Sequence, residues 1–531
     1  MSGESTNEQE SATSAEPESV EKTELLEDTA EDTECTTMHV REEFVEILMS
    51  SNTARDSTKG IEPTKKQTKM IKSIEGRMNK LFQDKLNSED AKPDDAIALA
   101  QSYLHISQVY SDVVWKDTLS EAYLLRSLGL LEGRETTRKA ILTAMKVCNC
   151  LGRIYLDLRN PKRSLSFYER AFLLYWTYTN RKDSYPAPVD ILYVFGVVTK
   201  EFQSGYSLDR QYMSTLSSLI NLHAQMDEGL HKPIITIYEH MLLQKQVRLI
   251  PLTIDRIQWA LKAAELAEYL STHKRFTEAR NHLGIAFYML KKFYRDEYEK
   301  IDGVNFPEMK ASLYKQYNDA VVRINIYMAQ YGLMLLSSSK ERLLRFGKED
   351  KRCETNFLTT VKQKLPESLM FTSTNNIQEE FNTWITDEYL VNYNDAKTVF
   401  LNVLRCFHEV SAYDSVISNP NTRVRILQEM SQACRYLAYY EQNEDKQIAL
   451  HSWRLDILKK ATNMLSTCNK QNKQDKFIWL ELATTHITIL DAHLDNLYIG
   501  HQKLQSNLPV NIANRVRHAL TSFQSYLNTD R

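Results

Sequence analysis

A few residues in this sequence have types and spacings that could support chemistry. His486 and His493 lie seven residues apart on one face of a predicted helix, where two imidazoles could share a metal ion. No carboxylate or cysteine shares that face, so the ligand set is incomplete. Two acidic pairs, Asp94-Asp95 and Glu379-Glu380, fit the starts of helices, where carboxylates interact with the helix dipole, better than acid–base catalysis.

The motifs of the common enzyme classes are absent from the sequence. It contains no GxGxxG, P-loop, HExxH, GxSxG or protein-kinase signature. His273 falls in a predicted turn, and His282 is predicted on the surface of a helix. Because no set of polar residues converges, we expect a protein that is not an enzyme and that binds no cofactor and no metal.

Composition indicates an all-helical protein. The 531 residues include only 14 glycines and 12 prolines, far below the usual shares of about 7% and about 5%. The net charge of −3 gives no reason to expect nucleic-acid binding. Seven cysteines without a disulfide or zinc pattern, and no apolar run of about 18 residues, predict a soluble cytoplasmic protein that does not enter membranes.

Two charged segments near the N-terminus stand out. Residues 1–34 contain 12 acidic residues and one lysine, and this polarity predicts disorder. The basic residues from Lys65 to Lys80 could contact acidic partners, although a solvated helix face is the simpler interpretation.

From about residue 94 onward the helical period dominates the sequence. We therefore expect an acidic tail, short helices with a polar linker, an N-terminal lobe, a long helical connector and a C-terminal lobe, at 1–38, 39–93, 94–300, 301–364 and 365–531.

The elements that would position a binding surface follow a repeat. Tetratricopeptide units are 34-residue helix pairs with fixed packing positions. If Leu266 is position 7, the residues at positions 8, 11, 17, 20, 24 and 27 all have the expected size; they are Ala267, Leu270, Phe276, Ala279, Leu283 and Ala286. The same frame fits Leu151, Gly152, Tyr155, Ser164, Tyr168 and Ala171. Weaker units can be placed at 99–125, at 219–241 and from Tyr436 through Ala449 and Trp453.

Two explanations of this pattern remain open at this stage. One is a non-repetitive helical bundle that happens to satisfy some positions. The other is an all-α, right-handed superhelical solenoid of degenerate tetratricopeptide-like pairs, in two lobes. Two good units favour the solenoid, whose first helices line a concave face. In the repeat frame, positions 6 and 9 of these helices carry Ser218, Asn221, Glu265 and Glu268, and position 9 also carries Arg153. Because the lysines that hold acidic C-terminal peptides are missing, this groove suits a polar or basic helix of a folded partner.

The sequence resembles the KIF-binding protein family, the kinesin-binding proteins. The resemblance covers roughly residues 95–525 and rests on three segments. These segments are RIQWALKAAELAEYLSTHKRFTEARNHLGIAF (256–287), NCLGRIYLDLRNPKRSLSFYERAFLLY (149–175) and YLAYYEQNEDKQIALHSWRLDILKKA (436–461). The most specific parts are the tryptophan that opens the first segment, the EAR after its turn, and WRLDIL in the last.

The resemblance implies a function. Members of this family hold the microtubule-binding helix of kinesin motor domains in the concave face and keep the motor off its track. They are linked to axonal growth, nervous system development and microtubule organisation, so the protein would be cytoplasmic and cytoskeleton-associated, and we expect a monomer. Contacts would come from Ser218, Asn221, Arg248 and Glu265. A general tetratricopeptide scaffold without a motor partner is the alternative.

Overall fold

The computed structural model describes most of the chain. The described residues are 37–58, 63–86, 92–113, 117–180, 185–197, 204–247, 255–346, 368–371, 385–413, 419–466, 473–499 and 508–528. The predicted acidic tail, apart from residues 37 and 38, lies outside them, as do Arg248 and Glu379-Glu380. Over these ranges every regular element is a helix and none is a strand, so the predicted all-α class is confirmed.

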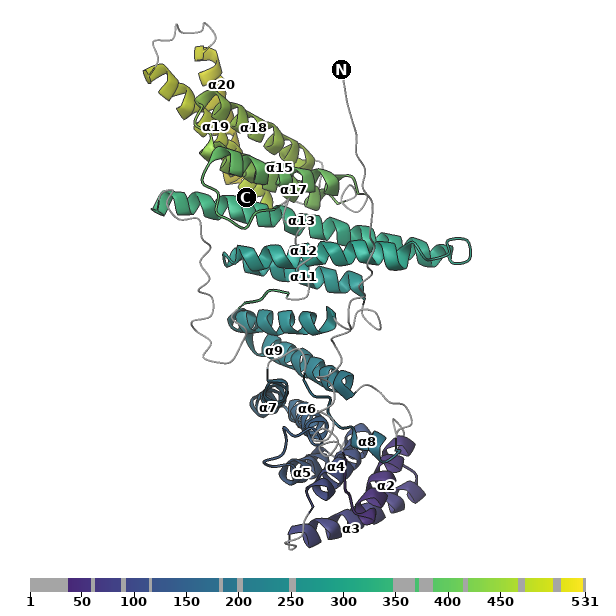
Figure 1. The fold of residues 1–531 in the computed structure, drawn as a ribbon. Coiled ribbons are helices and arrows are strands. Elements are labelled where there is room, and N and C mark those ends of the chain that lie inside the picture. The colour runs from purple at the N-terminus through teal and green to yellow at the C-terminus, as the bar shows by residue number, and fades with distance from the viewer. Residues whose placement is uncertain are drawn as a thin grey trace, which may run out of the picture. The chain divides into compact units, whose positions relative to one another are not determined.

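The helices follow one another along the chain (Figure 1). They are α2 (Glu42–Thr58), α3 (Lys65–Leu86), α4 (Pro93–Val113), α5 (Asp117–Leu130), α6 (Ile141–Asp157), α7 (Pro161–Thr179), α8 (Ile191–Val194), α9 (Ser204–Val247), α11 (Arg256–Thr272), α12 (Phe276–Phe293), η1 (Tyr294–Tyr298), α13 (Pro307–Phe346), α15 (Tyr393–Ser411), α17 (Pro420–Tyr440), α18 (Glu444–Ser466), α19 (Lys473–Ile499) and α20 (Leu508–Asn528).

The chain divides into two compact units, and the division falls inside a helix. Unit 1 ends at His231 and unit 2 begins at Lys232, within α9 and just before its internal Pro233. The sequence placed the first lobe boundary near residue 300 instead, because the DGVNFP stretch reads as a strong break. In the structure this stretch is only the turn between two helices of unit 2.

Unit 1 is built from helix pairs that pack side by side. α4 packs against α5 and α6 against α7, while α2 and α3 cover α4. Gly152 of α6 is required by the close approach of α7, since a Cβ built there would lie 2.7 Å from the Tyr168 ring. The Ser164 hydroxyl donates to the Gly152 carbonyl at 2.7 Å. The small residues at repeat positions 8 and 20 therefore allow the contact that the repeat frame predicts.

The turns of the two best-matching units have the same geometry. Arg159 and Lys274, both at repeat position 15, adopt left-handed conformations with φ of 56° and 62°. The next amide in each turn donates to the carbonyl at position 11, Tyr155 at 2.8 Å and Leu270 at 2.9 Å. This pattern closes a helix C-terminus. Two turns that agree residue by residue identify α6–α7 and α11–α12 as copies of one tetratricopeptide-like unit.

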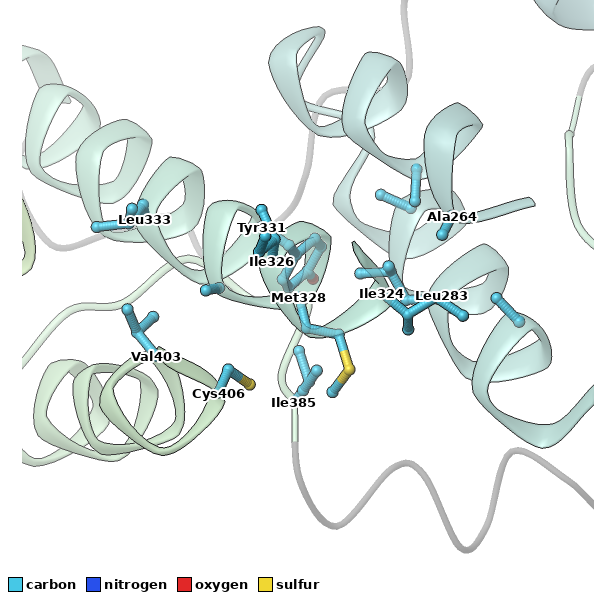
Figure 2. Close-up of a cluster of buried hydrophobic side chains, with 14 of the residues drawn as sticks. Ala264, Leu283, Ile324, Ile326, Met328, Tyr331, Leu333, Ile385, Val403 and Cys406 are labelled. Atoms are coloured by element: carbon cyan, nitrogen blue, oxygen red, sulfur yellow. The ribbon is translucent and has the colours of Figure 1, made fainter. Parts of the chain in front are cut away.

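Beyond α9, the described helices of unit 2 form four pairs that stack on one another. They are α11–α12, α13–α15, α17–α18 and α19–α20, and α13 contacts α11, α12, α15 and α17. The first pair contributes the predicted packing residues to the core, and all seven from Leu266 to Ala286 are buried. Figure 2 shows how Leu283 of α12, Ile324 and Met328 of α13 and Val403 of α15 meet in one apolar cluster.

The long helix α13 is part of this core. The sequence suggested a helical connector over 301–364, on the argument that a helix of this length serves as a spine. One continuous 40-residue helix does form, but its middle is buried from Ala320 to Leu336 on the inward side. Gly332 touches α15 so closely that a Cβ would lie 2.5 Å from Val403 Cγ2.

One of the weaker predicted repeat units is wrong, and a second has the wrong register. The segment 219–241 lies inside the single 44-residue helix α9 and contains no turn, although Pro233 sits within it. The unit from Tyr436 through Trp453 spans the turn of the pair α17–α18, but Ala449 and Trp453 are exposed, whereas Leu455 and Leu458 face the core. The third weak unit, 99–125, coincides with the pair α4–α5. Apolar spacing alone therefore located some helix pairs and failed to fix their register.

Beyond α12 the chain makes one π-helical turn. In η1 the amide of Glu299 donates to the carbonyl of Tyr294 at 2.9 Å. The rings of Tyr294 and Tyr298 stack with centroids 5.0 Å apart, and α13 adds Tyr317 and Tyr314 at 5.0 and 5.6 Å. This aromatic set ties the end of α12 to the start of α13.

Candidate partner-binding surface

The structure places the predicted surface residues on first helices of pairs and on α9. Arg153 lies on α6, and Ser218 and Asn221 lie on α9, all in unit 1. Glu265 and Glu268 lie on α11 in unit 2. We describe the two groups separately, as the unit 1 surface (Arg153, Ser218, Asn221) and the unit 2 surface (Glu265, Glu268).

In the unit 1 surface, Arg153 and Ser218 meet at Tyr168. The Tyr168 side chain is buried, and this burial raises its pKa above the usual value, while a hydrogen bond to Ser218 and the charge of Arg153 lower it. Arg153 is exposed and also donates to the Ser111 hydroxyl at 2.8 Å. The packing of Tyr168 over Gly152 therefore sets the position of two polar groups at the surface.

A second polar contact fixes α9 against α6. The Asn149 amide donates to the backbone carbonyl of Gln211 at 3.3 Å, and the Thr215 hydroxyl donates to Asn149 Oδ1 at 2.8 Å. Ser218 and Asn221 follow Thr215 along α9 at helical spacing, half-buried and exposed respectively. The three predicted residues of unit 1 are thus carried by two helices held together by hydrogen bonds.

The unit 2 surface is acidic and close to other charges. Glu265 pairs with Lys262 of the same helix, with Nζ and Oε2 3.0 Å apart. Glu268, almost one turn later, is exposed. Its pKa is raised by partial burial and by the charge of Glu265, and it is lowered by Arg425 of α17. The Glu268 carboxylate therefore lacks full solvation and faces a second helix pair.

Three residues of neighbouring pairs extend the unit 2 surface. Gln330 of α13 donates to Glu429 of α17 at 3.1 Å, and Arg425 lies 3.9 Å from the same carboxylate. Burial raises the pKa of Glu429, and Glu268 raises it further. Among the described residues, Gln330 Oε1 and Glu429 Oε2 are buried and have no hydrogen-bond partner. From here on the unit 2 surface includes Gln330, Arg425 and Glu429.

Sequence reasoning missed these three residues for a physical reason. α11, α13 and α17 lie side by side as first helices of successive pairs, but more than 50 residues separate their contributions along the chain. The local sequence of one helix does not indicate which turns of a distant helix it will face. The only available signal was the 34-residue register, and it is interrupted between α12 and α17.

His273 lies in the predicted turn, but the environment of His282 differs from the prediction. His282, predicted at a helix surface, is fully buried on α12, where Nε2 lies 3.1 Å from His240 Nδ1 and the ring contacts Phe371. Burial lowers the pKa of His282 to about 4. His486 is buried and stacks on His518. Among the described residues, no group of three or more His, Cys, Asp or Glu could hold a metal ion.

Within the ranges described above, no helix is both long enough and apolar enough to cross a bilayer.

Comparisons with known proteins identify relatives of this chain. The family model described as KIF-1 binding protein C terminal matches residues 257–531, just over half of the sequence. A KIF-binding protein of Drosophila melanogaster is 23% identical over 296 residues, 56% of this chain and 47% of that protein. One of Danio rerio is 22% identical over 418 residues, 75% of this chain and 63% of that protein. The chain therefore spans about half to two thirds of the length of the curated relatives it matches.

One solved structure was compared as well. A chain from the crystal structure of the APC/C hetero-tetramer Cut9-Hcn1 is 12% identical, covers 87% of this chain and 91% of its own length, and gives a TM-score of 0.16. A TM-score of 0.16 does not establish a shared fold. The assignment of tetratricopeptide-like pairs rests instead on the buried repeat positions and the matching turns of α6–α7 and α11–α12.

Proposed function

Since this chain belongs to the KIF-1 binding protein C-terminal family, we propose that it binds kinesin motor domains without catalysing a reaction. The family membership is the observation that carries the proposal. The chain supplies polar surfaces on stacked helix pairs, which suit the recognition of a helix from another folded protein. In this proposal the bound motor cannot reach the microtubule, because its microtubule-binding helix is covered.

The unit 2 surface has the chemistry expected of a site for a basic helix. Glu265, Glu268 and Glu429 bring three carboxylates together with two cations, Lys262 beside Glu265 and Arg425 beside Glu268 and Glu429. Two buried acceptor atoms, on Gln330 and Glu429, lack donors among the described residues. A buried acceptor without a donor costs about 1–3 kcal/mol. A lysine or arginine of the partner would supply donors and reduce the repulsion between the carboxylates.

The unit 1 surface would contribute neutral and cationic contacts. Arg153 and Asn221 are exposed, and Ser218 is half-buried beside Tyr168. These groups can donate hydrogen bonds to backbone carbonyls or carboxylates of the partner. Arg248, outside the described residues, remains a predicted contact.

Binding of purified motor domains to the full chain tests the proposal directly. Glu268→Arg should weaken binding about tenfold, because reversing a contact charge next to Arg425 removes roughly 1.4 kcal/mol. Asn221→Ala should weaken it by a smaller factor. Asp456→Arg is the matched control: Asp456 is also exposed, but on α18, the second helix of its pair. Its reversal should leave the affinity unchanged.

The outcome of this comparison separates two functions. Absence of binding to every motor domain at low salt would refute the kinesin proposal, and a pull-down dominated by non-motor proteins would support a general scaffold. If Glu268→Arg and Asp456→Arg change the affinity for the motor domain equally, the protein still binds motors, but the unit 2 surface is not the binding site.

The cellular role follows from the same proposal. A protein that removes motors from microtubules would act in the cytoplasm on the cytoskeleton, and axonal transport and microtubule organisation would depend on it. Co-sedimentation tests this step, because the full chain should move motor domains from the microtubule pellet to the supernatant. Sedimentation equilibrium of the purified chain tests the proposed monomeric state.

A further inference from the structure

The outer face of α3 is strongly cationic. Lys65, Lys66, Lys69, Lys72 and Lys80 are all exposed, and at 100° per residue they share the side of the helix opposite its buried residues Ile71, Ile74, Met78 and Leu81. Among the described residues, none of these five lysines forms an ion pair. We call them the α3 lysine face.

Two other charged groups of α3, Arg77 and Glu75, have partners on neighbouring helices. Arg77 pairs with Glu46 of α2 at 2.7 Å. Glu75 accepts hydrogen bonds from Tyr110 of α4 and Tyr123 of α5 at 2.7 and 2.8 Å. These contacts hold α3 against α2 and α4 (Figure 1) and leave Glu75 occupied. Lys65, Lys66, Lys69 and Lys72 therefore repel one another at helical spacing with no carboxylate among them, whereas Asp84 follows Lys80 by four residues.

The same chain contains a segment of opposite charge. Residues 1–34 carry a net charge of −11, from 12 acidic residues and one lysine. Since the whole chain carries −3, the remainder carries +8. The acidic segment thus offsets a basic body, and the α3 lysine face is a concentrated part of that positive charge.

The connection between the two segments allows them to meet. Residues 39 and 41 are fixed at the start of α4, where the His39 amide donates to Asp94 at 2.8 Å and the Arg41 side chain pairs with Asp95 at 2.7 Å. Six residues link the end of α3 to α4, so that end lies within about 25 Å of the anchor. α3 is about 33 Å long. The 36 residues before Thr37 can span up to about 120 Å, which covers the whole lysine face.

We propose that the acidic segment 1–34 binds the α3 lysine face of its own chain. The attachment keeps the segment at an effective concentration of about millimolar near the face, so many weak ion pairs act together. While bound, the segment occupies the cationic surface and prevents acidic partners from using it. This inference is independent of kinesin binding and would hold if that proposal failed.

Carbodiimide cross-linking of the full chain tests where the acidic segment lies, because this reagent joins carboxylates to lysines in direct contact. Cross-links from residues 4–34 should favour the α3 lysine face at least about fivefold over five exposed lysines of unit 2, namely Lys315, Lys397, Lys446, Lys459 and Lys460. In 1 M salt, where the Debye length falls to about 3 Å, this preference should disappear. Equal labelling of both lysine sets at low salt would overturn the proposal.

An isotope mixture distinguishes binding within one chain from binding between chains. Cross-linking a mixture of heavy and light protein should give α3 products of one isotope only. Mixed products in proportion to the mixture would show that the segment binds a second copy, and this result too would overturn the proposal.

Proteolysis gives a readout that does not depend on the lysines being modified. A glutamate-specific protease should cut the acidic segment about three- to tenfold faster when the five α3 lysines are changed to glutamine. The matched variant, with the five unit 2 lysines changed to glutamine, has the same net charge and should be cut at the original rate. If both variants, or neither, are cut faster, the α3 lysine face does not hold the segment.

Discussion

Replacing Gly152 by alanine tests the close approach of α6 and α7. The new Cβ would lie 2.7 Å from two atoms of the Tyr168 ring and 2.9 Å from a third. Overpacking of this kind costs about 1–3 kcal/mol, and the better helix propensity of alanine returns about 1 kcal/mol. We expect a net loss of about 1 kcal/mol. For a unit of this size, that loss lowers the thermal midpoint by about 2–4 °C.

The control is a glycine of the same unit without a close neighbour. Gly76 lies in the middle of α3, and a Cβ there would meet nothing within 4 Å. Gly76→Ala should therefore stabilise unit 1 by about 0.5–1 kcal/mol. Calorimetric melting of both variants, with hydrogen exchange of α6 and α7 amides to localise the effect, gives shifts of opposite sign if the packing is as described.

A double-mutant cycle identifies the cause of the loss. Tyr168→Leu removes the ring, so Gly152→Ala in that background should become stabilising by about 1 kcal/mol. If Gly152→Ala raises the melting temperature in the original background, the helices do not approach as described. If it remains equally destabilising without the Tyr168 ring, the clash lies elsewhere.

Three further predictions concern buried groups. Gly332→Ala should destabilise unit 2 by about 1–3 kcal/mol because its Cβ would meet Val403 Cγ2 at 2.5 Å. In urea denaturation, Val403→Ala should lower the free energy of unfolding less in the Gly332→Ala variant than in the original protein. His282 is neutral in the fold because burial lowers its pKa to about 4, whereas the unfolded chain takes up a proton below about pH 6.5. Stability should therefore fall by about 2 kcal/mol between pH 7 and 5, and His282→Gln should remove that share of the slope in melts across this range. Burial raises the pKa of the Cys148 and Cys406 thiols to about 12, so iodoacetamide at pH 8 should leave both unmodified until urea is added, as mass spectrometry would show.

Much of the fold could be predicted from the sequence because its local rules are strong. The scarcity of glycine and proline predicted an all-helical chain, and the small residues Gly152, Ser164, Ala267 and Ala279 marked where helices approach. All four are buried at helix contacts. Each of these contacts joins residues of one repeat unit, which are close in the sequence, so the local pattern is enough to predict the contact.

Long-range features could not be predicted in the same way. DGVNFP at 302–307 reads as a domain break, but the choice between a turn within a unit and a boundary depends on what α13 packs against. His282 was expected at a surface because the repeat frame fixes its helix and leaves the neighbouring helices undetermined. The partnership of Glu268 with Arg425 and Glu429 likewise depends on the order in which pairs stack.

The π-helical turn η1 also shows where this chain can change in length. A π turn contains one residue more than an α turn over the same span, so deleting one residue from η1 would restore the α-helical period. The residues after Glu299 would then keep their direction, and they form an exposed turn. A deletion earlier in α12 would instead rotate Leu283 and Ala286 out of the core. Insertions and deletions in related chains should therefore accumulate at this end of the α12–α13 hairpin.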